Sequence, residues 1–182
     1  TEQIHASCLQ HLASVVTSKG EGHLREALEL YDHARALYEK VADSDADQAH
    51  CFTQQGLITT HLGHLADAET YYHQALTLYK HPNTPIEHAT CLQHLATCLA
   101  HMPNRTTDTL KTLDNALDIL THTNTSETAP QRLTILLSLT HTHLINGDHF
   151  LAHIHANAAL DLCTNINQTD THHAHFTYAA VL

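Results

Sequence analysis

The chain has 182 residues, 42% of them hydrophobic, with only 5 glycines and 4 prolines, a composition that favours a folded, helical protein over a disordered or loop-rich one. Its 8 lysines and arginines against 19 aspartates and glutamates give a net charge of −11, which argues against a phosphate-binding surface and so against nucleic acid as a partner. No apolar run approaches the length of a membrane span, and no basic segment followed by an apolar one indicates a secretion signal. We therefore expect a cytoplasmic protein with no membrane partner.

Apolar residues recur with helical spacing along the whole chain, interrupted by short polar turns, several of which contain glycine or proline. Gly63 is placed to cap the end of one helix, and Pro85 suits the first position of another. A further turn surrounds Gly147. The sequence predicts nine helices, at residues 2–18, 23–41, 47–62, 65–80, 85–101, 106–121, 127–145, 149–164 and from 169 onward.

Internal repeats are visible in the sequence itself. The hexapeptide CLQHLA occurs twice, at residues 8–13 and 91–96. A small residue also recurs in the first helix of each successive helix pair, at intervals of 43, 40, 44 and 40 residues. These positions are Ala13, Gly56, Ala96, Thr140 and Ala180. A period near 40 residues made of two helices is typical of an α-solenoid, although an antiparallel bundle with alanine-rich seams stays open as an alternative.

The segment 52–75 carries the repeat pattern most clearly. Its aromatic, small, turn and packing residues lie at the positions that the tetratricopeptide repeat (TPR) family uses, namely Phe52, Gly56, Gly63, Leu65, Ala68, Tyr72 and Ala75. The chain thus resembles TPR proteins, and its long period is similar to variants in kinesin light chains and some signalling ATPases rather than to the usual period of about 34 residues. The other repeats match more loosely. The resemblance implies an all-α fold, a right-handed superhelix of four helix pairs plus a ninth helix.

We expect one TPR-like domain over residues 1–182. Its repeats are predicted at residues 2–43, 45–83, 85–123 and 127–166, with a partial repeat at 169–182. Phe176, Ala179 and Ala180 repeat the opening of a first helix, and no second helix follows them. We therefore expect the sequence to be part of a longer protein, or its end to be covered by a partner.

The resemblance also implies a concave groove lined by the first helix of each pair. The groove positions are Gln10, Ser14, Thr53, Leu57, Gln93, Thr97, Leu137 and His141. They are almost all uncharged, and they lack the lysine, arginine and asparagine with which some TPR proteins hold the acidic C-termini of heat-shock chaperones. We therefore expect a neutral or amphipathic peptide as the ligand. The alternative is a groove that is only solvated, or is filled by the rest of the chain.

The 21 histidines are the only candidates for catalysis or metal binding. His149 and His153 are four residues apart on one predicted helix, a spacing that can place two imidazoles on one metal ion, but no third ligand is evident. A second cluster contains His172, His173 and His175. We expect no cofactor, no metal and no enzymatic activity. Full protonation would move the net charge from −11 to +10, so the surface should change character between pH 7 and about pH 5.

The five cysteines are widely spaced and all fall within predicted helices. This pattern indicates buried, reduced thiols rather than a disulfide framework. The residues are Cys8, Cys51, Cys91, Cys98 and Cys163.

Three functional hypotheses follow from the sequence. The first is a protein-interaction scaffold that binds a peptide or helix of a partner protein in its groove. The second is a regulatory or structural arm of a larger enzyme or multiprotein complex. The third is a metal- or pH-responsive module that uses the histidines. We favour the first, with the partner and the oligomeric state left open.

Overall fold

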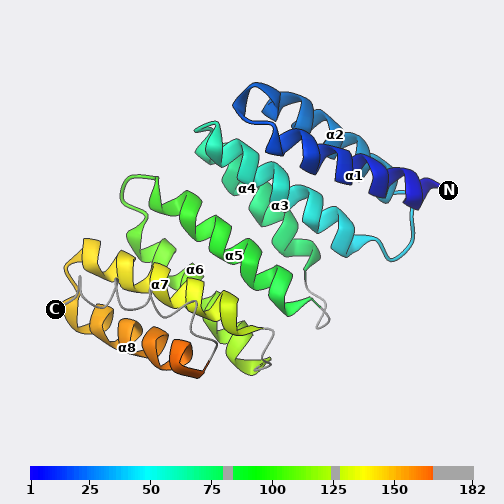
Figure 1. Cartoon of the computed structure of the whole chain (residues 1–182). Coiled ribbons are helices and arrows are strands. Elements are labelled where there is room, and N and C mark those ends of the chain that lie inside the picture. The colour runs from blue at the N-terminus through cyan, green and yellow to red at the C-terminus, as the bar shows by residue number, and fades with distance from the viewer. Residues whose placement is uncertain (80–83, 124–127, 166–182) are drawn as a thin grey trace. The chain divides into compact units, whose positions relative to one another are not determined.

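The computed structural model describes residues 1–79, 84–123 and 128–165, and within these ranges the secondary structure is helical (Figure 1). Eight α-helices and one short 3-10 helix follow one another in these three ranges. They are α1 (Glu2–Ser18), η1 (Glu21–His23), α2 (Leu24–Tyr38), α3 (Asp45–His61), α4 (Leu65–Leu78), α5 (Pro85–Ala100), α6 (Thr106–His122), α7 (Ala129–Asn146) and α8 (His149–Asn165). The first eight predicted helices are confirmed to within a few residues at their ends. The ninth, from residue 169, lies outside the described residues.

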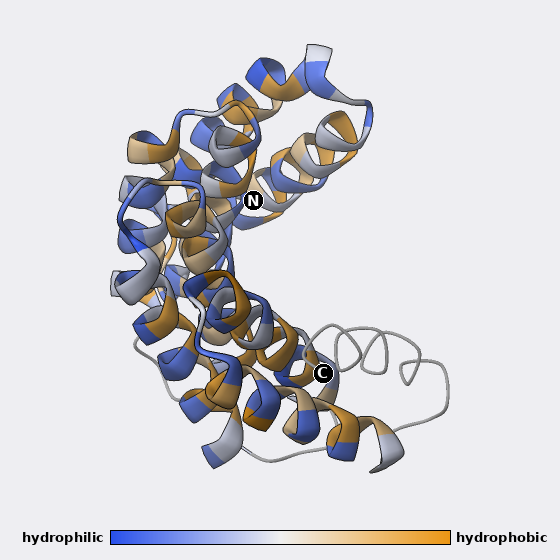
Figure 2. Cartoon of the chain, turned by 90° about the vertical axis from the view of Figure 1, so that its left-hand side faces the viewer, coloured by the Kyte–Doolittle hydropathy of each residue, from blue (hydrophilic) through white to orange (hydrophobic). Residues whose placement is uncertain are grey.

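The chain divides into two compact units, residues 1–98 and 99–182. In the first unit α1 packs on α2, α2 on α3 and α3 on α4, and most of α5 belongs to this unit as well. In the second unit α6 packs on α7 and α7 on α8. Hydrophilic and hydrophobic residues alternate around the helices (Figure 2), as expected for helices that each bury one stripe of their surface.

Glycines end two of the first helices in the same way. At the end of α3, Gly63 has a φ of 80°, its N–H donates to the Thr60 carbonyl, and the His64 N–H donates to the Thr59 carbonyl. At the end of α7, Gly147 has a φ of 81° with the same pattern of hydrogen bonds. This is the Schellman arrangement, in which a left-handed residue satisfies the last free carbonyls of a helix. Both predicted glycine turns are confirmed.

The second helix of each pair buries one regular set of four positions, spaced i, i+4, i+7 and i+11, and every member is at most 2% exposed. These sets are Ala27, Tyr31, Ala34 and Tyr38 on α2; Ala68, Tyr72, Ala75 and Tyr79 on and just after α4; Thr109, Leu113, Ala116 and Leu120 on α6; and Ala152, Ala156, Ala159 and Cys163 on α8. The spacing keeps all four side chains on one face of a helix. The small members let neighbouring helices approach closely, and in the first unit the tyrosines fill the space between them.

The helices α3 and α4 approach each other closely at Gly56. A Cβ atom on Gly56 would lie 2.7 Å from Cε1 of Tyr72, so the ring occupies the space that any other residue would need. The Tyr72 hydroxyl is 3.3 Å from the Thr60 hydroxyl, and its ring stacks on His94 of α5 with 6.4 Å between centroids. Tyr72 therefore joins three helices of the first unit.

Four of the five cysteines are buried, as predicted. Cys8 is the exception, because it is exposed on α1. Burial raises the pKa of both Cys51 and Cys91 to about 12, so these thiols stay protonated and unreactive at neutral pH. The Cys91 thiol donates to the Tyr72 carbonyl at 3.8 Å.

Candidate peptide-binding surface

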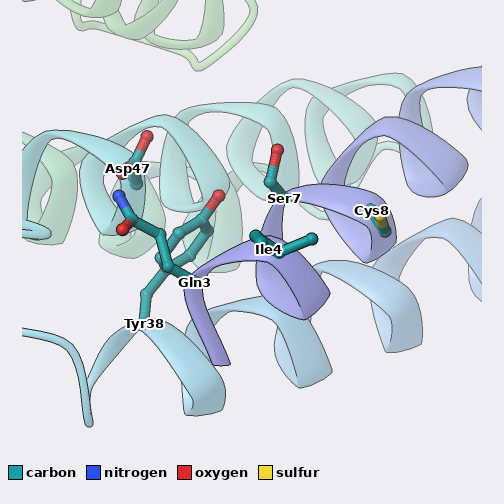
Figure 3. A pocket seen from close by; sticks show the side chains of 6 residues that line it. All are labelled: Gln3, Ile4, Ser7, Cys8, Tyr38 and Asp47. Carbon is teal, nitrogen blue, oxygen red and sulfur yellow. The ribbon is translucent and has the colours of Figure 1, made fainter. Parts of the chain in front are cut away.

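A pocket of about 340 Å³ opens in the first unit where α1, the end of α2 and the start of α3 meet (Figure 3). Its lining residues are Gln3, Ile4, Ser7, Cys8, Tyr38 and Asp47. In Figure 3 the Tyr38 ring reaches from α2 toward α1, with Gln3 and Asp47 beside it. The pocket thus combines hydroxyl, amide and carboxylate groups with one aliphatic side chain, a mixture that suits a polar side chain with an apolar stem.

Tyr38 links this pocket to the predicted groove. The residue is only 2% exposed, and its hydroxyl donates to Oε1 of Gln10 at 2.8 Å. Burial, together with the charge of Asp47, raises the pKa of Tyr38 to about 12, so its hydroxyl remains a neutral donor. Gln10, a predicted groove residue, is therefore held in place by a buried tyrosine that also lines the pocket.

Carboxylates and histidines lie close together on the first helices of this unit. The imidazole of His50 on α3 is near Asp47, Glu87 of α5 and His11 of α1. Burial lowers the pKa of His50 and outweighs the two carboxylates, which act in the opposite direction, so the ring is neutral at pH 7. The sequences of α1, α3 and α5 contain no lysine or arginine. The N-terminal ends of α1, α3 and α5 therefore carry negative charge, which interacts favourably with the positive ends of the helix dipoles.

The structure places the predicted groove residues of the first unit in two different environments. Gln10, Leu57 and Gln93 are half-buried, and Ser14 and Thr97 are exposed. We call the exposed and half-buried members the first-helix surface; they are Gln10, Ser14, Leu57, Gln93 and Thr97.

Thr53 differs from this set, because it is only 5% exposed. Its hydroxyl donates to the Ala49 carbonyl at 2.9 Å, and it also contacts Tyr79 and Cys91. It is therefore part of the helix packing, and we leave it out of the surface. In the second unit, Leu137 is partly buried and packs against the α7–α8 core, and His141 is exposed.

Sequence reasoning missed most of the pocket. Gln3 and Ser7 continue the spacing of Gln10 and Ser14 as i, i+4, i+7 and i+11, so a polar stripe along α1 was available as a signal. Tyr38 and Asp47 could not be added in this way, because they come from the end of one helix and the start of another.

The histidines form no evident metal centre in the described ranges, where no group of three or more histidine, cysteine, aspartate or glutamate side chains is arranged to hold an ion. On α8, Nδ1 of His153 is 3.0 Å from the side-chain nitrogen of Asn157, which engages one ring nitrogen of the predicted His149–His153 pair. The cluster of His172, His173 and His175 lies outside the described residues. Among the helices that the structure describes, none is long and apolar enough to cross a membrane.

No protein-family model matches the chain, and no curated protein matches it in sequence. Solved structures do match. Aspartyl phosphate phosphatase F from Bacillus subtilis superposes with a TM-score of 0.88 at 12% identity, over 100% of this chain and 46% of that one. The nearly identical TPR-like repeats of a Podosopora anserina kinesin light chain superpose with a TM-score of 0.78 at 15% identity, over 100% of this chain and 86% of that one. The chain has a TPR-like fold.

A third TPR-like structure adds the signalling ATPases to this comparison. The STAND protein PH0952 from Pyrococcus horikoshii, a signal-transduction ATPase with a tetratricopeptide repeat sensor, has a TM-score of 0.79 at 14% identity, over 97% of this chain and 26% of that one. The chain spans less than half the length of the phosphatase and about a quarter of the ATPase. The predicted fold class and the resemblance to long-repeat TPR proteins are thus confirmed as a matter of fold, and the bundle alternative is set aside.

Proposed function

We propose that the chain is a non-catalytic protein-interaction scaffold that binds a peptide or helix of another protein on the first-helix surface of its first unit. The observation that carries the proposal is the pocket of about 340 Å³ beside that surface. A pocket beside this surface, whose residues are polar except for Leu57, offers a side-chain anchor and hydrogen-bonding groups for an extended or helical segment. The division of the chain into four repeats of one domain remains part of this proposal.

The chemistry of the pocket indicates what side chain would enter it. Asp47 supplies a carboxylate, Ser7 and Gln3 supply neutral hydrogen-bonding groups, and Ile4 supplies an apolar contact. With no lysine or arginine on α1, α3 or α5, an acidic side chain would meet repulsion without compensation. We therefore expect the bound segment to present a neutral or basic side chain.

The experiment is a selection of peptides from a displayed library on the full chain, followed by fluorescence anisotropy titrations. Asp47→Asn removes the pocket charge and keeps its shape, and should weaken a selected peptide about tenfold. Asp45→Asn is the matched control, because Asp45 is an exposed residue of the same helix that does not line the pocket. Equal affinities for the wild type, Asp47→Asn and Gln10→Ala would contradict the proposal.

A second candidate function is a regulatory or structural arm of a larger protein. It is supported by the matches to the B. subtilis phosphatase and to the P. horikoshii ATPase, whose own tetratricopeptide repeats form a sensor, because this chain covers only part of each. In that case the first-helix surface would contact other domains of the same polypeptide. A library selection that yields no specific peptide would favour this second role over the first.

A further inference from the structure

Two histidine rings stack between α7 and α8, which pack on each other in the second unit (Figure 1). The rings of His143 on α7 and His155 on α8 have centroids 5.3 Å apart, and their planes are inclined by only 12°. His143 is 6% exposed, and His155 is half-buried. We call this contact the histidine pair. Its two imidazoles face each other where the helices pack.

The repeats allow the same two positions to be compared in all four helix pairs. The first position lies three residues after the small residue of each first helix, and its occupants, all at most 6% exposed, are Val16, Thr59, Leu99 and His143. The second position lies three residues after the first member of each buried set of four, and its occupants, all half-buried, are Leu30, Tyr71, Thr112 and His155. Burial is thus alike in the four pairs that the structure describes. The last pair alone places there groups that take up protons near pH 6.

Each ring of the histidine pair has a carboxylate near it. Oδ2 of Asp148, in the turn after α7, is 3.6 Å from Nδ1 of His143 and also accepts a hydrogen bond of 2.7 Å from the side-chain amide of Asn146. Nδ1 of His143 is buried and has no hydrogen-bond partner in the described part of the chain. A proton on His143 therefore creates an ion pair with Asp148. On the other side, Asp114 of α6 is the carboxylate that acts on His155.

This arrangement accommodates one positive charge but opposes two. Burial disfavours a charge on His155, and a like charge on the facing ring of His143 disfavours it further. Burial, the larger effect, and His143 together lower the pKa of His155, and Asp114 opposes them without reversing the result. Because this pKa lies below the ordinary value of about 6.5, the contact contributes stability above about pH 6.5 and loses it as the pH falls.

We propose that the histidine pair is a pH-sensitive switch, which holds α8 on α7 while at least one ring is neutral and releases α8 when both rings are protonated. Release uncovers the buried set of α8, namely Ala152, Ala156, Ala159 and Cys163. Acid thus makes accessible an alanine-rich helix face that is covered at neutral pH. The switch lies in the second unit, and it does not depend on the peptide binding that we propose for the first.

Hydrogen–deuterium exchange of the full chain, read by mass spectrometry, measures this release directly. Exchange times at pH 7.5 and pH 5 are corrected for the intrinsic exchange rate of unstructured amides at each pH, so that protection can be compared between them. We expect the protection of α8 to fall at least about tenfold between the two pH values. The protection of α2, in the first unit, should fall less, because the opening is local to α7 and α8.

A double variant removes both titrating rings. It combines His143→Thr with His155→Tyr and so uses the residues that α3 and α4 carry at the same positions, Thr59 and Tyr71. The protection of its α8 should fall less than about twofold over the same pH range. The matched control is His122→Tyr on α6, because the side chain of His122 is 78% exposed, and this variant should behave as the wild type.

Asp148→Asn tests the switch with both rings in place, so it does not depend on whether the double variant folds. It removes the carboxylate that compensates the first proton, and α8 should therefore lose its protection at a pH about 0.5 or more above that of the wild type. Protection of wild-type α8 that is unchanged down to pH 5 would overturn the proposal, as would a profile of Asp148→Asn that matches the wild type. So would an equal loss in the wild type and the double variant, or in α2 and α8, since acid would then act on the chain as a whole.

Discussion

Replacing Gly56 by alanine is the sharpest test of how α3 and α4 interlock. The added Cβ would lie 2.7 Å from Cε1 and 2.9 Å from Cδ1 and Cζ of Tyr72, distances at which something must move. The ring has little room to move, because it is 0% exposed, is stacked on His94 and has its hydroxyl 3.3 Å from that of Thr60. The substitution therefore forces α3 and α4 apart or distorts the ring.

The expected size follows from two opposing contributions. Alanine in place of glycine inside a helix normally stabilises by about 0.5–1 kcal/mol. Overpacking of a close-packed contact costs about 1–3 kcal/mol. The free energy of unfolding of Gly56→Ala, measured by urea titration with circular dichroism, should therefore fall by about 1–2 kcal/mol. Gly22→Ala is the control, since a Cβ there meets no atom within 4 Å, and its effect should stay within about 0.5 kcal/mol.

A double-mutant cycle isolates the contact. If the ring of Tyr72 causes the loss, Gly56→Ala should be neutral or stabilising in a Tyr72→Ala background, with a coupling energy of at least about 1 kcal/mol. Equal effects of Gly56→Ala with and without the ring would refute the reasoning, because the cost would then have another origin.

Three further predictions concern the seam, a turn and the dependence on pH. Ala75→Leu overpacks the α4 seam, where Ala75 is 0% exposed, and should lower stability by about 1–3 kcal/mol; an unchanged melting curve would place Ala75 outside a helix contact. Gly63→Ala puts a Cβ on a residue with a φ of 80° and should cost about 1–2 kcal/mol in urea titrations, and a change near zero would contradict the left-handed cap. Burial lowers the pKa of four histidines in the folded state. In the unfolded chain a histidine has its ordinary pKa of about 6.5, so below that pH the unfolded chain binds more protons than the folded one. These histidines are His50, His88, His94 and His155. Their contribution to stability is present above about pH 6.5 and is lost as the pH falls, so the melting temperature should drop between pH 7.5 and pH 5, and a flat or rising profile would refute the assignment.

The buried face of the second helix in each pair could be predicted from the sequence, because it depends only on the size of residues that are three and four positions apart. Ala68, Tyr72 and Ala75 lie four and three residues apart, and this spacing alone puts them on one face. The end of α3 at Gly63 could be predicted too, since few residues other than glycine adopt the left-handed conformation that ends this helix. Such features depend on a few neighbouring residues and not on the rest of the fold.

The exposure of individual side chains could not be predicted in the same way. Cys8 and Cys91 occupy the same place in the two copies of the hexapeptide, yet Cys91 is buried against α4 whereas Cys8 is exposed. Thr53 lies in the register expected for the groove, but the neighbouring Tyr79 and Cys91 enclose it. Periodicity identifies the face of a helix, whereas burial depends on which other elements reach that face. The pocket at Tyr38 was missed for the same reason, because three helices form it.

The contact between Gly56 and the ring of Tyr72 tests most directly how successive helices pack in the first unit, and this packing sets the positions of the surface residues there. Nuclear Overhauser contacts between the Gly56 α-protons and the Tyr72 ring protons can be recorded on a carbon-13-labelled sample. We expect strong contacts, ring-current-shifted glycine protons and loss of both features in Tyr72→Leu. Glycine protons at ordinary shifts with no contact to that ring would contradict the packing of α3 on α4, and with it the account of this chain as interlocked helix pairs.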